Sequence, residues 1–387
     1  MVNRKRLADM FMFLVGIDSV SREESEISKH LQTLLASMGA DIRVDGAASA
    51  VGGNAGNLIA RFDGHADVPT LMLNAHMDTV EPGRGVVPIF EDGVFRSDGR
   101  TILGADDKSA IAIIIETIRI IQEGGLPHGP LEVVLTVCEE IGLMGAKHLN
   151  FECITAKHGY ALDASSIEGI VTRAPAANRF EIRVHGKDAH AGAAPEKGIN
   201  AILLASKAIA RLDLGRIDEE TTCNIGTIEG GTATNIVPDR VTLRGEVRSH
   251  DTDKLEQMTE KIVKTFEDAV RAAKTADDDP LPRVEFDIHH DFPATAIAPD
   301  HPVVATARKA AANLGRVLEP QMTGGGADAN IFFDRGIVTG VLGTGMKDMH
   351  TVRESVALED MVGMTELLLE IIRLHTEQYL DKNLLEL

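Results

Sequence analysis

The sequence has few cysteines, few basic residues and no long apolar run. Cys138, Cys153 and Cys223 are widely spaced and form no CxxC pair, which argues against a disulfide framework and a thiolate zinc site. No stretch reaches the roughly 18 apolar residues of a membrane-spanning helix. Basic residues number 39 against 59 acidic ones, and the formal charge of -20 repels nucleic acids and anionic membranes. We expect a cytoplasmic protein with small-molecule or peptide partners and no nucleic-acid or membrane partner.

The N-terminal segment places basic residues ahead of the apolar stretch "MFMFLVGI", which is the order of a secretory signal. Asp9 interrupts the approach, the apolar stretch is short, and no small-residue cleavage site follows. We therefore expect no signal peptide. With 387 residues, 44% of them hydrophobic, the chain is long enough to fill the cores of two domains.

Two styles of alternation divide the chain. Up to about residue 170, apolar strand-like runs alternate with helical patterns, which predicts a mixed sheet flanked by helices. Residues 176–291 instead follow the βαββαβ order of a split ferredoxin-like domain, with an exposed acidic loop expected at "TADDDPLP", residues 275–282. The first style then resumes. We predict a large α/β domain formed by residues 1–175 and 292–387, with the smaller domain inserted into it.

Polar side chains follow the ends of several predicted strands. Ligands collect beyond the carboxyl ends of the strands in an open α/β sheet, because loops and helix starts converge there. Four strands end in side chains able to bind metal or transfer protons, and two aspartates precede a long apolar helix. These residues are His76 and Asp78, Glu139 and Glu140, Asp163, His350, and Asp106 and Asp107. Taken singly, each could be a helix cap, a turn former or a solvated loop residue.

Their common location favours a metal site. Several carboxylates and two imidazoles in one crevice, without a balancing group of lysines or arginines, need a positive charge that a divalent ion supplies. Carboxylate and imidazole ligands without thiolate suit zinc, and also cobalt or manganese, in a hydrolytic site. Of two adjacent glutamates, one can bind metal while the other acts as general base toward water.

The segments "NAHMDTV", "GADDKSAIA", "CEEIGLMGA" and "MHT", together with Asp163, carry a resemblance to a known family. They resemble the co-catalytic zinc peptidases, which include peptidase T, aminoacylase, glutamate carboxypeptidase and succinyl-diaminopimelate desuccinylase. The resemblance covers nearly the whole chain and is closest to the peptidase T branch, whose characterised members remove the N-terminal residue of tripeptides. It implies a zinc-peptidase catalytic domain with a ferredoxin-like lid domain inserted.

The resemblance implies two Zn²⁺ ions per subunit, with Co²⁺ or Mn²⁺ as alternatives. One ion is expected on His76, Asp106 and Asp163, and the other on Asp106, Glu140 and His350. Asp106 would therefore bridge the two ions. The family also has a cis peptide bond after this aspartate, here between Asp106 and Asp107.

Two further residues of the same site have implied roles. Glu139 is expected to be the general base, which takes a proton from a water shared by the metals and passes it to the leaving amine. Asp78 is expected to accept the second ring N–H of His76 and so to orient the imidazole toward the metal.

A second set of residues is implied to contact substrate. His190 is expected to stabilise the tetrahedral oxyanion, often from the neighbouring subunit, and Asn235 and Arg248 to contact a substrate carbonyl or carboxylate. Their structural alternatives are a loop histidine, a turn asparagine and a surface arginine paired with an acid. Gly325 and Asp328 lie in "TGGGADANIFFDRG", which lacks a P-loop lysine and a GxGxxG motif. Gly325 is expected in the substrate pocket wall.

We predict a cytoplasmic tripeptide aminopeptidase that forms a homodimer through the lid domain and closes on short peptides. Three alternatives stay open: a carboxypeptidase or dipeptidase, an N-acyl-amino-acid deacylase, and an inactive binding protein with the same fold. The first two would use the same metals. The third would be marked by a lost ligand or a lost general base, and the sequence retains all of them.

Overall fold

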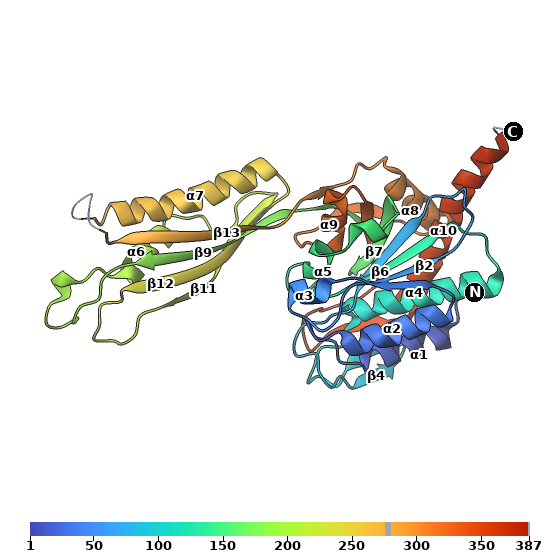
Figure 1. Ribbon diagram of the computed structural model, residues 1–387, viewed down its shortest axis with the longest axis horizontal. Coiled ribbons are helices and arrows are strands. Elements are labelled where there is room, and N and C mark those ends of the chain that lie inside the picture. Colours follow the sequence, from blue (N-terminus) through green and yellow to red (C-terminus); the bar gives the residue numbers. More distant parts are fainter. Residues whose placement is uncertain (275–279, 386–387) are drawn as a thin grey trace. The chain divides into compact units, whose positions relative to one another are not determined.

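A computed structural model describes residues 1–274 and 280–385 of the chain (Figure 1). Two compact units are present: the large unit, Met1–Arg173 with Ala296–Leu387, and the inserted unit, Ala174–Thr295. The predicted domain limits, at residues 175/176 and 291/292, lie within a few residues of these junctions, and as domain boundaries they stay a prediction. Most of the predicted acidic loop, residues 275–279, lies outside the described residues.

The large unit contains a nine-stranded mixed sheet, which confirms the predicted fold class. Its strands run in the order β1-β2-β6-β3-β7-β16-β8-β14, with β15 paired to β8. The central strands β6, β3, β7 and β16 are parallel, so their carboxyl ends share one edge. The bounds are β1 Asp41–Val44, β2 Leu58–Phe62, β3 Leu71–His76, β6 Leu131–Thr136, β7 His158–Ala164, β8 Gly169–Ala174, β14 Thr295–Ala296, β15 Glu319–Met322 and β16 Val338–Gly343.

Helices pack against this sheet through their apolar side chains. Six of the described helices share the main core with the strands: α1 Arg4–Val15, α2 Ser25–Ser37, α3 Ala47–Val51, α4 Ala105–Gly124, α8 Pro302–Asn313 and α10 Leu358–Leu385. The isoleucine-rich helix α4 is buried over nearly its whole length, as expected for a helix with apolar residues on most of its surface. The other short helices of this unit are α5 Met144–Lys147 and α9 Asp328–Asp334, and a single 3-10 turn spans Phe151–Cys153. A second such turn, Pro195–Lys197, belongs to the inserted unit.

A small three-stranded sheet lies beside the main one and was not predicted from the sequence. Its order is β17-β5-β4, formed by Ser355–Ala357, Val94–Ser97 and Pro88–Glu91. β17 follows directly after the segment that carries His350, so this sheet brings residues near position 95 close to that segment.

The inserted unit is a separate antiparallel sheet with strand order β10-β11-β12-β9-β13. Its elements are β9 Ala176–His185, α6 Ala201–Ile209, β10 Gly215–Arg216, β11 Thr221–Gly230, β12 Arg240–Ser249, α7 Thr252–Arg271 and β13 Arg283–Phe292. Buried residues of the strands pack with α6 and α7 into one core. Figure 1 shows α7 running along this sheet. The predicted βαββαβ order is present, with the two-residue strand β10 added.

No helix in residues 1–274 and 280–385 is both long enough and apolar enough to cross a membrane. The three cysteines are free, and Cys138 and Cys223 are buried.

Candidate metal centre

The carboxyl ends of the parallel strands bring the predicted ligands together. His76 is the last residue of β3, and Asp163 lies near the end of β7. Glu140 follows β6, and His350 lies in the loop after β16. The crevice position therefore follows from parallel pairing, because these strands all end at the same edge of the sheet.

Asp106 lies between the two histidines. Its Oδ1 is 3.0 Å from Nε2 of His76, and its Oδ2 is 3.2 Å from Nε2 of His350. The same His350 nitrogen is 3.0 Å from Oε2 of Glu140. One carboxylate oxygen thus faces each histidine, which is the arrangement that a bridging ligand requires.

Among the described residues, two groups of side chains could each hold a metal ion, because the potential ligand atoms within each group all lie within 4.8 Å of one another. One group is His76, Asp106 and Glu140, and the other is His76, Asp107 and Asp163. Asp107 was not among the predicted ligands. Its Oδ2 accepts the backbone N–H of His76 at 3.2 Å, while its Oδ1 is buried without a hydrogen-bond partner.

The start of α4 shapes this part of the site. The Asp106–Asp107 peptide bond is cis, as the resemblance implied, and both residues have non-helical backbone angles. No side chain caps the helix, so neither aspartate has the N-cap role that is its structural alternative. Both carboxylates are instead available to the cluster.

Burial and mutual repulsion make the ionised form of several carboxyl groups in the cluster costly. Burial, and then repulsion from neighbouring carboxylates, raises the pKa of both Glu139 and Asp163. Hydrogen bonds to Asp106 and Glu140 raise the pKa of His350 to about 10. Burial would raise the pKa of Asp106, but hydrogen bonds from His350 and His76 outweigh it and lower that pKa.

No lysine or arginine of the described residues forms an ion pair with these carboxylates. Lys108 is buried nearby, but its ammonium group donates to the carbonyl oxygen of Ile17 at 2.6 Å. The donor set of imidazole and carboxylate, with the unpartnered oxygen of Asp107, therefore fits divalent metal ions, which would balance the buried charge.

Asp78 has a different set of contacts from the predicted one. The nearest acceptor to Nδ1 of His76 is the main-chain carbonyl of Asp78, at 2.9 Å, whereas its carboxylate lies at 3.4 Å. The carboxylate accepts the backbone N–H groups of Glu139 and Glu140, at 2.9 and 3.3 Å, and the hydroxyl of Ser21 at 2.6 Å. The carboxylate of Asp78 also lies within reach of the His76 ring, so its predicted orienting role stays a prediction, and the structure adds its contacts to the two glutamates and a nearer main-chain acceptor for His76.

Two other acidic residues lie close to the site: Glu24, which sequence reasoning missed, and Asp328, which it considered only as pocket wall or as a helix start. Buried Glu24 accepts the backbone N–H of Cys138 at 3.0 Å, and Cys138 has a left-handed φ of 54° in the segment leading to the glutamates. Buried Asp328 accepts the Thr136 hydroxyl, and burial raises the pKa of Asp328 to about 6. No local motif marks Glu24, but Asp328 stands in the glycine-rich segment already considered as pocket wall.

Comparison with known proteins adds the family. Residues 57–164 match Peptidase family M28, and residues 176–274 match the Peptidase dimerisation domain. The crystal structure of aminopeptidase PepT from Bacillus cereus ATCC 10987 has a TM-score of 0.89 and 41% identity, covering 97% of this chain and 99% of that one. This chain is a peptidase T-like member of the co-catalytic metallopeptidase family.

Two further relatives resemble this peptidase T-like chain along almost its entire length. A tripeptidase structure from Staphylococcus aureus subsp. aureus Mu50 has a TM-score of 0.92 and 38% identity, covering 97% of this chain and all of that one. The Bacillus subtilis (strain 168) protein described as "Uncharacterized protein YqjE" is 44% identical over 373 residues, 96% of this chain and 99% of that protein. The predicted family is confirmed.

His190 and Asn235 of the peptidase T-like chain lie on neighbouring segments of the inserted unit. The backbone N–H of Ala191 donates to the carbonyl oxygen of Asn235 at 2.9 Å. Nδ1 of His190 accepts the backbone N–H groups of Gly192 and Ala193 at 3.2 and 3.1 Å. The neutral imidazole therefore carries its proton on Nε2, which leaves that nitrogen as a hydrogen-bond donor.

The other two predicted substrate contacts have partners within their own units. The Arg248 guanidinium pairs with both carboxylate oxygens of Glu246, at 3.0 and 3.1 Å, and lies 5.8 Å from the Phe292 ring centroid. The backbone N–H of Gly325 donates to the Thr323 hydroxyl at 3.2 Å. Their roles toward substrate remain predictions.

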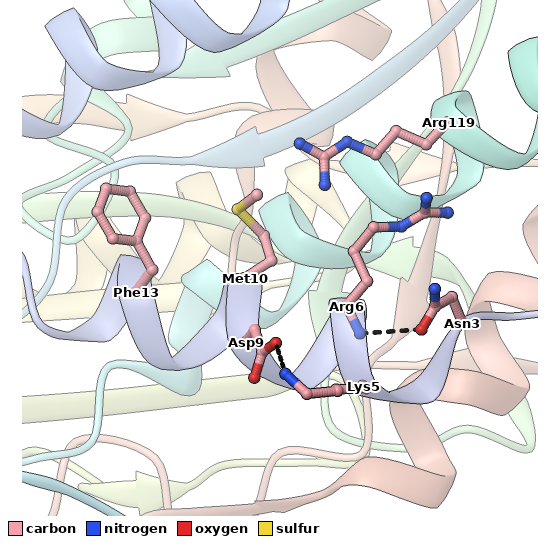
Figure 2. Close-up of a pocket in the computed structure, with 7 residues that line it drawn as sticks. All are labelled: Asn3, Lys5, Arg6, Asp9, Met10, Phe13 and Arg119. Atoms are coloured by element: carbon pink, nitrogen blue, oxygen red, sulfur yellow. Dashed lines mark hydrogen bonds and ion pairs between the residues drawn. The ribbon is translucent and has the colours of Figure 1, made fainter.

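Figure 2 shows a surface pocket of about 300 Å³ on α1 and α4, which is separate from the ligand cluster. Its Arg6 pairs with Glu116 and Glu123, and its Lys5 pairs with Asp9. The pocket lining contains no histidine and only one carboxylate, Asp9, so it lacks the donor set of the ligand cluster.

Proposed function

We propose that this protein is a metal-dependent aminopeptidase that releases the N-terminal residue of tripeptides. The observation that carries the proposal is the complete ligand cluster with an adjacent glutamate, in a chain that matches an aminopeptidase and a tripeptidase over nearly its full length. We further propose cytoplasmic location, which the three free cysteines support.

The proposed cofactor is a pair of Zn²⁺ ions, with Co²⁺ or Mn²⁺ as substitutes. His76, Asp106 and Asp163 would hold one ion, and Asp106, Glu140 and His350 the other. Nitrogen and oxygen ligands without thiolate support this choice. When bound, such ions supply Lewis acidity toward the scissile carbonyl and lower the pKa of water.

Glu139 is the proposed general base. It is buried, Asp78 holds its backbone N–H, and its carboxyl group lies close enough to Asp163, His76 and Glu140 for their charges to act on it. Burial and the charge of Asp163 raise its pKa, which makes its carboxylate a stronger proton acceptor. It would take the proton of the attacking water and deliver it to the leaving amine.

His190 is proposed to donate its Nε2–H to the oxyanion that forms on the substrate carbonyl. Asn235 is a proposed substrate contact beside it. Arg248 is proposed for a substrate carboxylate or carbonyl, and substrate would then compete with Glu246 for its guanidinium group. Gly325 is proposed as pocket wall.

A homodimer formed through the inserted unit is also proposed. The match to the Peptidase dimerisation domain supports it. In the described part of the chain, β10 pairs only with Thr222 and Cys223, so residues 224–230 leave the outer edge of β11 unpaired. Ile202, Leu203 and Ile228 expose between 40% and 52% of their surface on α6 and β11. Such edges are usually covered in the native assembly.

The function is tested with free tripeptides and their N-acetylated and C-amidated forms. We expect cleavage of the free and C-amidated peptides and little cleavage of the acetylated ones. Preference for acetylated substrates would favour a deacylase, and loss of cleavage on amidation would favour a carboxypeptidase.

Glu139→Ala is the matching variant test. The loss of general base catalysis is expected to lower kcat at least about 100-fold. Metal content, measured by mass spectrometry, should stay at the wild-type value because Glu139 is not a proposed ligand. Wild-type turnover in this variant would rule out the mechanism, and an inactive wild-type enzyme across the peptide panel would favour a binding protein.

A further inference from the structure

Glu354 is buried beside the metal cluster without being one of its proposed ligands. Only 1% of the surface of this residue is exposed. Oε2 accepts the backbone N–H groups of Leu103 and Gly104 at 2.7 and 2.8 Å, and Oε1 accepts that of Asp106 at 3.0 Å. All three donors come from the short segment that leads into α4 and carries the central ligand Asp106.

These backbone groups are the only hydrogen-bond donors to Glu354 in the described residues, and no basic side chain forms an ion pair with it. A buried carboxylate is costly unless several hydrogen bonds satisfy it, and charge-assisted bonds from backbone N–H groups are among the stronger ones. The segment from Leu103 to Asp106 is therefore built around the Glu354 carboxylate.

Glu354 also stands at the end of the loop that carries His350. Backbone hydrogen bonds from Lys347 to Ser355 and from Ser355 to Lys347, at 2.8 and 3.1 Å, close this loop just after Glu354. A further backbone bond joins the N–H of Glu354 to the carbonyl of Thr351 at 3.1 Å. His350 lies inside the loop and has a left-handed φ of 61°, so the loop holds its backbone in an uncommon conformation.

We propose that Glu354 is a positioning residue that sets the distance between Asp106 and His350 by tying the two segments together. The inference rests on the proposed metal function. Asp106 and His350 are separated by more than two hundred residues in the sequence, and their ring and carboxylate atoms are 3.2 Å apart. Loss of the Glu354 anchor would let both segments shift, and the second metal position, on Asp106, Glu140 and His350, would weaken most.

The test compares Glu354→Gln with Glu132→Gln. Glu132 is also fully buried in the large unit and accepts two backbone N–H groups, those of Thr155 and Ala156, at 3.0 Å. Both substitutions replace an acceptor oxygen by an amide donor in a site built for a carboxylate. Only the first one touches a ligand segment, so a stability loss common to both variants is separated from a metal effect.

The measurement is calorimetric titration of the full-length metal-free protein with Co²⁺, together with the visible absorption of the bound ion. Urea unfolding of the metal-free protein runs in parallel. We expect Glu354→Gln to weaken the second Co²⁺ site by about 10- to 100-fold and to change its absorption band, with Glu132→Gln close to wild type. Glu354→Asp keeps the charge but shortens the side chain, and the same weakening is expected. If Glu354→Gln does not fold, Glu354→Asp is measured in its place.

Equal Co²⁺ affinity and equal spectra for the Glu354 and Glu132 variants would overturn the positioning role. That result differs from a failure of the proposed function, in which wild-type protein itself would bind no Co²⁺ pair and hydrolyse no peptide.

Discussion

Asp78 shows how one side chain can support two others, the proposed general base Glu139 and the proposed metal ligand Glu140. Its carboxylate is fully buried and receives the backbone N–H groups of Glu139 and Glu140. Its main-chain carbonyl oxygen accepts a hydrogen bond from Nδ1 of the His76 ring. The residue therefore fixes the proposed general base through its side chain and a proposed ligand through its main chain, and only the first of these depends on the residue type.

Replacing Asp78 by alanine is expected to lower kcat by about 10- to 100-fold, the usual loss when a group that orients catalytic residues is removed. Retention of the main-chain carbonyl should leave the His76 imidazole in place. Steady-state kinetics and metal analysis of the same preparation check both points. Ser21→Ala is the control, because it removes a single donor to this carboxylate and should cost less than tenfold. An Asp78 variant with unchanged kcat would contradict this role.

At the scale of elements, parallel strands bring the ligands to one edge and short irregular segments orient them. Three buried carboxylates hold two ligand segments: Asp78 and Glu24 hold the segment after β6, and Glu354 holds the start of α4. Each of these segments lacks regular hydrogen bonding of its own at the ligand. Buried acceptors therefore do the work that helix or sheet ladders do elsewhere.

Helix α6 and strand β11 carry the proposed dimer surface. Leu203→Glu would place an unpaired charge there, and the dimer dissociation constant is expected to rise at least about tenfold. Light scattering over a protein dilution series measures this change. Ile288→Glu on β13, at the opposite edge of the same sheet, is the matched control and should leave the dimer intact. A wild-type protein that is monomeric at all concentrations would exclude the dimer.

At the scale of the whole molecule, the large unit is assembled from both ends of the chain. Helix α1 and helix α10 contribute to the same core as α4 and the central strands. Three histidines from distant segments also lie close together in this unit. The His158 and His301 rings have centroids 5.2 Å apart, and His375, which also influences His158, donates its Nε2–H to the Pro69 carbonyl oxygen at 2.8 Å. Because that carbonyl only accepts, His375 carries a proton on Nε2.

This histidine group predicts acid sensitivity. Burial lowers the pKa of His158, His301 and His375, and the neighbouring histidines lower that of His158 further. Above pH about 6.5, all three are neutral in both the folded and unfolded chain, so their contribution does not vary. Below it, the unfolded chain binds protons that the folded chain resists, and stability falls as the pH drops.

Urea unfolding at several pH values between 7.5 and 5 measures this effect. His158→Gln is expected to reduce the loss of stability on acidification, by at most about 1.4 kcal/mol per pH unit for one histidine. His65→Gln, at an exposed position outside the group, should follow the wild-type curve. Parallel curves for wild type and His158→Gln would show that this group does not control acid stability.

The sequence by itself determined the alternation of strands and helices, the inserted βαββαβ unit and the family. It also indicated which polar residues follow buried strands, because residue periodicity and strand ends are local features that sequence displays directly. His76, Asp106, Asp163, Glu140 and His350 were found in this way and through motif resemblance.

Only the tertiary structure decided which groups hold those residues in place. Glu354 bonds to Leu103, Gly104 and Asp106 across sequence separations of 248 to 251 residues, and no local pattern encodes such a contact. Asp78 contacts His76 through its carbonyl oxygen and the two glutamates through its carboxylate. These contacts likewise depend on how β3 and the segment after β6 are placed relative to each other. A hydrogen bond between distant segments depends on atomic positions, and these are set by the packing of the whole unit.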